Sequence, residues 1–83
     1  MKKIAIISAI LESPGDEQRE FNDVISSYKN IVKGRLGLPF DQEQIAVISL
    51  TVAADERTID EMTERLSAIE GVSVNKLVSK RSI

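Results

Sequence analysis

The sequence contains no cysteine, no histidine and no tryptophan, and its aromatic side chains are one tyrosine and two phenylalanines. Without cysteine there is no disulfide, no thiolate nucleophile and no iron–sulfur cluster. Without histidine the chain lacks the usual general base near neutral pH and the commonest ligand of transition metals. We therefore predict no catalytic residue and no metal site, and we expect a protein that is not an enzyme.

Long apolar runs are also missing. Residues 4–11 form a short one, but a Ser-Pro-Gly turn follows without a signal-peptide cleavage site, and the run is far too short to cross a bilayer. The 83 residues are 42% hydrophobic and 29% charged, with a net charge of −2, which is typical of one small soluble domain. We expect a single cytoplasmic domain over residues 1–83, with no membrane contact and a frayed tail at 79–83.

Four segments have the composition of strands. Residues 4–11 and 44–53 are rich in β-branched residues and are apolar on both faces. Residues 31–39 carry two glycines and a closing proline, which favours a place at the edge of a sheet. Residues 72–78 alternate around valines and suit a strand with one buried face.

A first helix is expected over residues 14–30. Ser13 is placed to cap it, and Pro14 suits its first position. Apolar residues then recur along one stripe, at Phe21, Val24, Ile25 and Tyr28.

A second helix starts either at a capping box over residues 58–61 or at Asp55. Gly71 suits a left-handed stop after it. Its apolar stripe consists of Ile59, Met62, Leu66 and Ile69.

The order of elements is therefore strand, helix, strand, strand, helix, strand. Each helix is long enough to return the chain to the same side of the sheet, and such crossovers are right-handed. These rules predict an α+β, ferredoxin-like βαββαβ fold, with a four-stranded antiparallel sheet in the order 4-1-3-2 and two helices on one face. Residues 4–11 and 44–53 then form the two central strands.

Half of the side chains on those central strands would face water in a monomer, because the helices cover only one face. A solvated face carries polar residues at alternate positions, but these strands offer only Ser8, Ser49 and Thr51. About half a dozen exposed aliphatic side chains forfeit several kcal/mol at ~25 cal/mol per Å². We therefore expect a homodimer or homotetramer formed through the sheet face or the sheet edges. A monomer with an apolar surface is the alternative.

The residues also exclude several functions of this fold. RNA recognition on such a sheet needs aromatic side chains on the central strands, and Phe21, Tyr28 and Phe40 all lie elsewhere. The net negative charge offers no basic face, so direct nucleic-acid binding is not expected. An acylphosphatase-like enzyme would need an arginine in the first loop, which residues 12–15 lack. Sensing or regulation is the role that remains.

Two glycine-containing segments are candidate sites for a small molecule. Ser13 and Gly15 stand at the start of the first helix, whose free N–H groups suit an anion; the alternative is a capped helix start. In the second segment, Gly34 and Gly37 would let a ligand or a partner backbone approach, and Arg35 would bind a carboxylate. The alternative there is an edge strand with a bulge and a solvated arginine.

Three stretches of the chain carry a resemblance to a known family. They are Gly34-Arg35-Leu36-Gly37-Leu38-Pro39-Phe40, Ile45-Ala46-Val47-Ile48-Ser49-Leu50 and Leu66-Ser67-Ala68-Ile69-Glu70-Gly71-Val72-Ser73-Val74. They closely resemble the putative iron-only hydrogenase system regulator family, whose small bacterial proteins are similar to the C-terminal domain of the nickel-responsive regulator. The resemblance covers nearly the whole chain, and it implies an ACT-like fold, dimers or tetramers, and a regulatory role.

The nickel-responsive relatives bind nickel through histidine and cysteine. This chain has neither, so the resemblance brings no nickel site and no cofactor. We also expect no DNA-binding segment, so any effect on transcription would pass through a partner protein. Our first hypothesis is a non-enzymatic, oligomeric regulatory module, linked to iron-only hydrogenase regulation, that binds an amino acid, another carboxylate or a partner protein. The alternative is a structural protein–protein interaction module without a ligand.

Overall fold

Strands β1 (Lys3–Leu11) and β3 (Ile45–Ala54) form the centre of the sheet in the computed structural model, which describes residues 1–83. Strand β2 (Val32–Phe40) pairs with β3, and β4 (Val72–Val78) pairs with β1, all antiparallel. The order β2-β3-β1-β4 is the predicted order 4-1-3-2 counted from the opposite edge. The segments that are apolar on both faces thus occupy the two strands with neighbours on either side.

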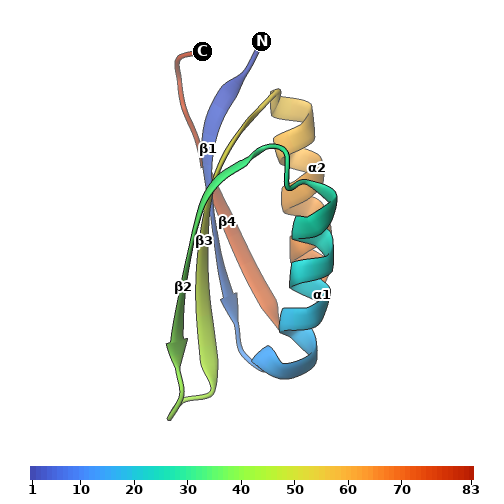
Figure 1. Cartoon of the computed structure of the whole chain (residues 1–83), viewed down its shortest axis with the longest axis vertical. Helices are drawn as coiled ribbons and strands as arrows, with labels where there is room; N and C mark the ends of the chain where they lie inside the picture. Colours follow the sequence, from blue (N-terminus) through green and yellow to red (C-terminus); the bar gives the residue numbers. More distant parts are fainter.

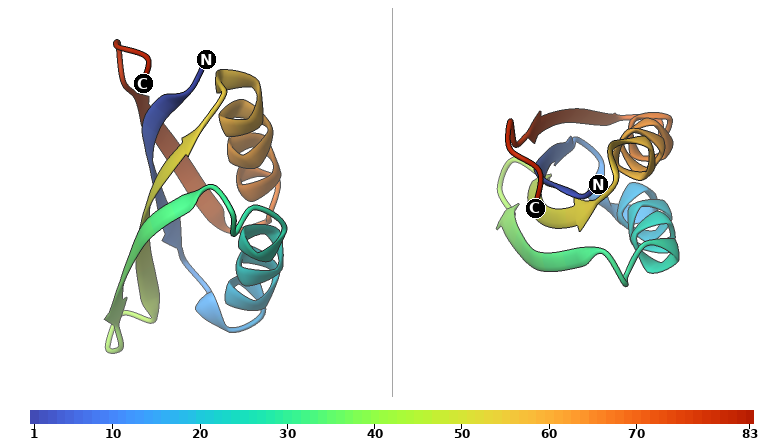
Figure 2. Two further views of the ribbon diagram at one scale, coloured as in Figure 1. Left: turned by 45° about the horizontal axis from the view of Figure 1, so that its top comes forward. Right: turned by 90° about the horizontal axis from the view of Figure 1, so that it is seen from above.

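Both helices, α1 (Pro14–Ser27) and α2 (Glu56–Ser67), lie on one side of this sheet (Figure 1). The view along the long axis shows the twisted sheet curving beside the helix pair as a single layer (Figure 2). The two chain termini lie together at one end of the molecule, and the turn between β2 and β3 lies at the other. The predicted ferredoxin-like βαββαβ fold is therefore confirmed.

Helix α1 ends at Ser27, three residues before its predicted end. The Tyr28 N–H donates to the Ile25 carbonyl oxygen at 2.9 Å, so the chain tightens into a turn there. Ser13 occupies the N-cap position as predicted, but its side chain makes no capping hydrogen bond. Its backbone N–H instead donates to Glu17 Oε1 at 2.9 Å, which brings a carboxylate to the positive end of the helix dipole.

Helix α2 begins at Glu56 under the cap of Asp55, one of the two predicted starts. Asp55 Oδ1 accepts a hydrogen bond from the Thr58 N–H at 2.8 Å, and hydrogen bonding to Thr58 lowers the pKa of the Asp55 carboxyl below its usual value. Gly71 has a φ of +84°, the predicted left-handed conformation, but the helix is already capped at Ala68. Gly71 therefore shapes the turn into β4 rather than the end of the helix.

The hairpin between β2 and β3 differs from the prediction by one residue in each strand. Strand β2 continues to Phe40, and β3 begins at Ile45. Gln44 has a φ of +57°, so it belongs to the turn rather than to the strand. A register shift at Lys33 gives β2 a bulge near its start, which is a common feature of edge strands.

The core lies between the helices and one face of the sheet. It contains 17 buried residues, all of them hydrophobic, so apolar burial is its main stabilising force. Both predicted helix stripes point into it, although Val24 is only partly buried. The buried members of the first stripe are Phe21 and Ile25 on α1 and Tyr28 directly after it; those of the second are Ile59, Met62 and Leu66 on α2 and Ile69 after its end.

Candidate functional site

Strand β1 carries a buried and an exposed set of side chains that alternate along it. Ile7 and Leu11 are completely buried under the helices, whereas Ile4, Ile6 and Ile10 are between 41% and 45% exposed on the opposite face. Residues paired across an antiparallel sheet point to the same side, so the register extends this second face over all four strands. We call it the exposed face. Its apolar members are Ile4, Ile6 and Ile10 on β1, Ile45, Val47 and Ala53 on β3, Leu36, Leu38 and Phe40 on β2, and Leu77 on β4.

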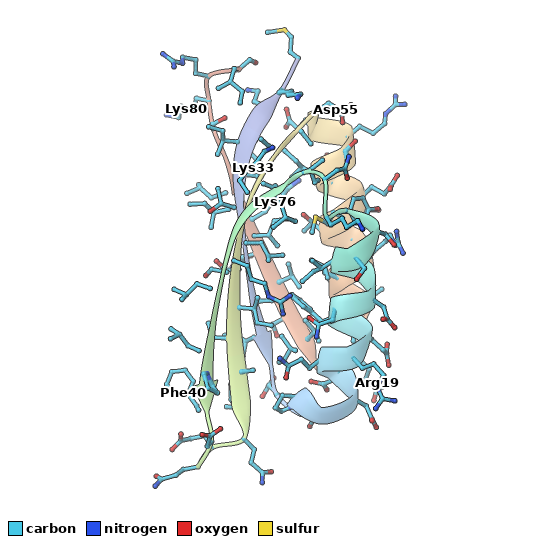
Figure 3. The ribbon with its side chains drawn as sticks, viewed as in Figure 1. Arg19, Lys33, Phe40, Asp55, Lys76 and Lys80 are labelled. Atoms are coloured by element: carbon cyan, nitrogen blue, oxygen red, sulfur yellow. The ribbon has the colours of Figure 1, made fainter.

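This surface is larger than the sequence indicated. The prediction rested on the two central strands, and the edge strand β2 adds Leu36, Leu38 and Phe40, which are 59%, 50% and 47% exposed. Phe40 projects on the side of the sheet away from the helices (Figure 3). The period-2 spacing of these three residues was the available signal, but the glycines and the proline between them concealed it.

A row of mostly small or polar side chains crosses the middle of the exposed face. Ser8 on β1 pairs with Ser49 on β3 and with Asn75 on β4, and Ser49 also pairs with Leu36 on β2. We call these four residues the central row. Apolar side chains lie on either side of it, with Thr51 on one side and Ser73 on the other as polar exceptions.

Gly34 and Gly37 lie in β2 with no intramolecular reason to be glycine. Neither has a positive φ, and a Cβ built on either residue meets no atom within 4 Å. Glycine weakens a strand, and where it is found in one it often marks the close approach of a ligand or of another backbone. The space around both residues is open to an approach from outside the protomer.

Arg35 lies between these glycines, with its side chain on the helix side of the sheet. Its partner on β3 is the buried Leu50, and its Nη2 donates to Asn22 Oδ1 on α1 at 2.7 Å. The guanidinium takes part in no ion pair, since the one ion pair of the molecule joins Lys76 to Asp60. Arg35 therefore keeps charge and N–H donors for an added carboxylate.

A cleft of about 730 Å³ opens between the start of α1 and the turn between β2 and β3. Ser13 and Gly15, the residues predicted to form an anion site, are among the residues that line it. However, the lining also holds six carboxylate side chains and no lysine or arginine, and this negative potential repels anions. The six are Glu12, Asp16, Glu17, Glu20, Asp41 and Glu70.

Glu17 already occupies the position that an anionic ligand would take at the start of α1. One of its carboxylate oxygens accepts the Ser13 N–H. The other lies so close to Gly71 that a Cβ there would overlap it. The carboxylate therefore fills the space that the glycine leaves, and the helix start has an internal anion.

The two predicted segments are not brought together. Ser13 and Gly15 line the acidic cleft, whereas Gly34, Arg35 and Gly37 lie along β2 and do not line it. No group of three or more histidine, cysteine or carboxylate side chains could hold a metal ion. No helix of the structure is long and apolar enough to span a membrane.

Tyr28, Glu61 and Arg65 form a polar cluster that joins α2 to the end of α1. The Tyr28 hydroxyl donates to Glu61 Oε1, and Arg65 Nη1 donates to the same hydroxyl oxygen at 3.2 Å. The guanidinium carbon of Arg65 also lies 5.3 Å from the centroid of the Tyr28 ring. Burial, followed by the hydrogen bond to Glu61, raises the pKa of Tyr28. The cluster fixes the helix pair on the covered side of the sheet.

Solved structures share this fold. Protein TM1266 from Thermotoga maritima is similar with a TM-score of 0.92 and 26% identity, over 96% of this chain and 100% of that one. The ACT domain of GTP pyrophosphokinase from Chlorobium tepidum has a TM-score of 0.78 at 18% identity, over 93% and 100% of the two chains. An ACT domain protein from Streptococcus pneumoniae has a TM-score of 0.64 at 14% identity, over 92% and 89%. These likenesses show that the fold is ACT-like.

A protein-family model also matches residues 3–76, which is most of the chain. Its description reads "TM1266-like: Iron-only hydrogenase system regulator, putative". A comparison with curated proteins finds no match. The family match confirms the resemblance seen in the sequence.

Proposed function

Since the chain belongs to the TM1266-like family, we propose that it is a non-enzymatic regulatory module. It self-associates through the exposed face, and it binds an effector with a carboxylate group, such as an amino acid, at the edge strand β2. The apolar character of the exposed face is the observation that carries this proposal. The link to a hydrogenase system rests on the description of the family.

The surface area of the protomer supports self-association. Its accessible surface is 5536 Å², whereas a monomeric protein of 9.2 kDa exposes roughly 4,900 Å². The difference of about 600 Å² approaches the ~800 Å² that each partner contributes to a standard interface. The protomer has this excess of accessible surface because it is elongated and because its sheet is covered on one side only. A second copy on the exposed face would remove it.

Electrostatics favour β2 over the cleft as the effector site. Strand β2 carries Lys33 and Arg35 and no acidic residue, and its glycines leave the backbone open. The cleft is lined by carboxylates, and Glu17 occupies the start of α1. A carboxylate ligand is therefore attracted to Arg35 and repelled from Ser13 and Gly15.

Thermal-shift titration with each of the twenty amino acids tests the effector site. We expect at least one to raise the melting temperature of the wild-type protein, and Arg35→Ala to abolish that rise. Arg19→Ala, which removes an exposed arginine of α1, is the matched control and keeps the rise. If Arg35→Ala leaves both the ligand response and the oligomeric state unchanged, Arg35 is not the effector site.

A structural interaction module without a ligand is the second candidate. It is favoured by the Arg35–Asn22 hydrogen bond, which already gives the arginine a partner within the protomer. Native mass spectrometry of freshly purified protein separates the two. A small molecule retained on the oligomer supports the regulatory module, and an oligomer without an adduct, combined with no thermal response to any amino acid, supports the interaction module.

A further inference from the structure

The charges of this protein are separated along its long axis. The molecule measures 41 × 18 × 18 Å, and we call the end with the chain termini the terminal end and the end with the β2–β3 turn the hairpin end. Lys80 lies at the terminal end, and Phe40 lies near the hairpin end (Figure 3). Three strands have a cation at the terminal end and a carboxylate at the hairpin end. Within or directly beside the strands, these are Lys3 and Glu12 for β1, Lys33 and Asp41 for β2, and Lys80 and Glu70 for β4.

None of these six charges forms an ion pair within the protomer. The one ion pair, Lys76 with Asp60, lies on the covered side of the sheet. All three carboxylates line the acidic cleft, which holds no cation of its own. The Lys3 ammonium donates to the carbonyl oxygens of Ser79 and Lys80 at 3.2 and 2.9 Å, which holds the basic tail beside β1. Although the net charge is only −2, these cations lie at the terminal end and these carboxylates at the hairpin end.

When two copies pack exposed face to exposed face with their strands aligned, the two-fold axis lies in the plane between them and runs either along or across the strands. An axis parallel to the strands places like ends together. An axis across the strands reverses the long axis, so the hairpin end of each copy lies over the terminal end of the other. Like charges facing each other oppose the first arrangement, and opposite charges favour the second.

Side-chain size suits both arrangements and does not select between them. In the rows next to the central row, Leu77 lies at the opposite edge from Gly34, and Leu38 lies at the opposite edge from Ser73. A large side chain therefore meets a small one whether the axis runs along or across the strands. The exposed face is complementary to itself in shape, and charge decides the orientation.

We propose that two copies associate with the two-fold axis across the strands, along the central row. This orientation rests on the self-association proposed above. Each strand then lies over the same strand of the second copy in the reverse direction. Glu70 precedes β4 at the hairpin end and Lys80 follows it at the terminal end, each five residues from Asn75 in the central row. Glu70 of one copy therefore faces Lys80 of the other. Asp41 and Glu12 at the hairpin end of one copy likewise lie toward the end of the second copy that holds Lys33 and Lys3.

Charge reversal on β4 tests the orientation. Glu70→Lys and Lys80→Glu are each expected to raise the dissociation constant of the dimer about tenfold at low salt, because each mutation acts twice in a symmetric dimer. The double variant restores the wild-type value, and 0.5 M salt removes most of the differences. Glu64→Lys, on the outer surface of α2, is the control without effect. With the axis along the strands, Glu70 would face Asp41 of the second copy. A tighter dimer for Glu70→Lys would therefore overturn the proposal.

A distance measurement tests the same orientation independently. The chain contains no cysteine, so Gln42→Cys allows one spin label per protomer at the tip of the hairpin. Gln42 lies six residues from Leu36 in the central row, so the proposed axis separates the two labels by roughly 40 Å. An axis along the strands would bring them within about 25 Å. A distance near 40 Å supports the orientation, and a short distance overturns it while leaving self-association in place. A 9.2 kDa monomer in sedimentation would overturn the self-association, and the orientation with it.

Discussion

The two faces of the sheet are built from alternate residues of the same strands, and on β1 both are aliphatic. Ile7 is completely buried beneath the helices, while its neighbour Ile6 is 43% exposed on the other side. A sheet face that meets water in the functional protein normally carries polar residues. Here small and polar side chains gather in a row near the middle of the exposed face, and apolar side chains occupy most of the other positions. The comparison supports the proposal that a second copy covers the exposed face, as the helices cover the other.

The two faces also differ in how they are closed. On the covered face the chain supplies everything itself: apolar packing, a helix cap at Asp55, and the cluster of Tyr28 with Glu61 and Arg65. On the exposed face no segment of the chain covers the aliphatic side chains. Mutations on the covered face should therefore change the stability of the protomer, and mutations on the exposed face should change association.

The largest effect is expected from Ile7→Ala on the covered face. Removing a fully buried isoleucine side chain leaves a cavity and lowers the free energy of unfolding by about 2–5 kcal/mol. The loss should be the same at every protein concentration, because Ile7 packs within one protomer. Urea unfolding at two concentrations a hundredfold apart measures it. A loss that disappears at high protein concentration would contradict the assignment of Ile7 to the protomer core.

The neighbouring substitution Ile6→Ala is the matched test of the exposed face. We expect it to weaken the dimer about tenfold, because roughly 1.4 kcal/mol of apolar contact is lost in association. When both proteins are diluted until they are monomers, their free energies of unfolding should agree within about 0.5 kcal/mol. Sedimentation equilibrium and urea unfolding of the dilute protein together check this. If Ile6→Ala destabilises the dilute protomer as much as Ile7→Ala does, the two faces do not differ as described.

Tyr28→Phe should have a smaller effect, confined to the covered side. It removes the hydroxyl that Glu61 and Arg65 share, and it should cost about 1–2 kcal/mol at neutral pH. Because the pKa of Tyr28 is raised in the folded protein, its contribution is present below pH 10 and is lost as the pH rises through the folded pKa. In urea unfolding from pH 7 to 11, the free energy of unfolding should therefore fall less with rising pH for Tyr28→Phe than for the wild type. Equal alkaline slopes would contradict this assignment.

The smallest effect is expected from Asp55→Ala at the start of α2. It removes the acceptor of the Thr58 N–H and should lower the melting temperature slightly, whereas Asp55→Asn keeps an acceptor and serves as the control. The pKa of Asp55 is lowered in the folded state, so its stabilising contribution is present above pH 3.8 and is lost as the pH falls through the folded pKa. In melting curves from pH 2 to 7, the melting temperature of Asp55→Ala should fall less at acid pH than that of the wild type. An acid slope identical to that of the wild type would rule out the cap as its source.

Features with a local cause could be predicted from the sequence. The strand order followed from residues 4–11 and 44–53, which are apolar on both faces, and from the glycines of residues 31–39. The end of α1 and the Tyr28 cluster could not be predicted as readily. The hydroxyl of Tyr28 meets Glu61 33 residues away in sequence, and no spacing rule links the two.

The candidate site was predicted only in part. Ser13 and Gly15 do lie at the start of α1, but no pattern showed that Glu17 would occupy the Ser13 N–H or that the surrounding cleft would be acidic. On β2 the bulge at Lys33 changes which alternate residues point to each face. The opposite orientations of Arg35 and Leu36 were therefore ambiguous until the register with β3 was known.

Sedimentation velocity of the wild-type protein tests the central claim most directly. A series from 1 to 100 µM at 0.15 M salt measures the mass of the species in solution without any substitution. The exposed face predicts a dimer or a larger assembly of the 9.2 kDa chain, with a share that grows with concentration. A single 9.2 kDa species throughout the series would contradict the claim that a second copy covers the exposed face.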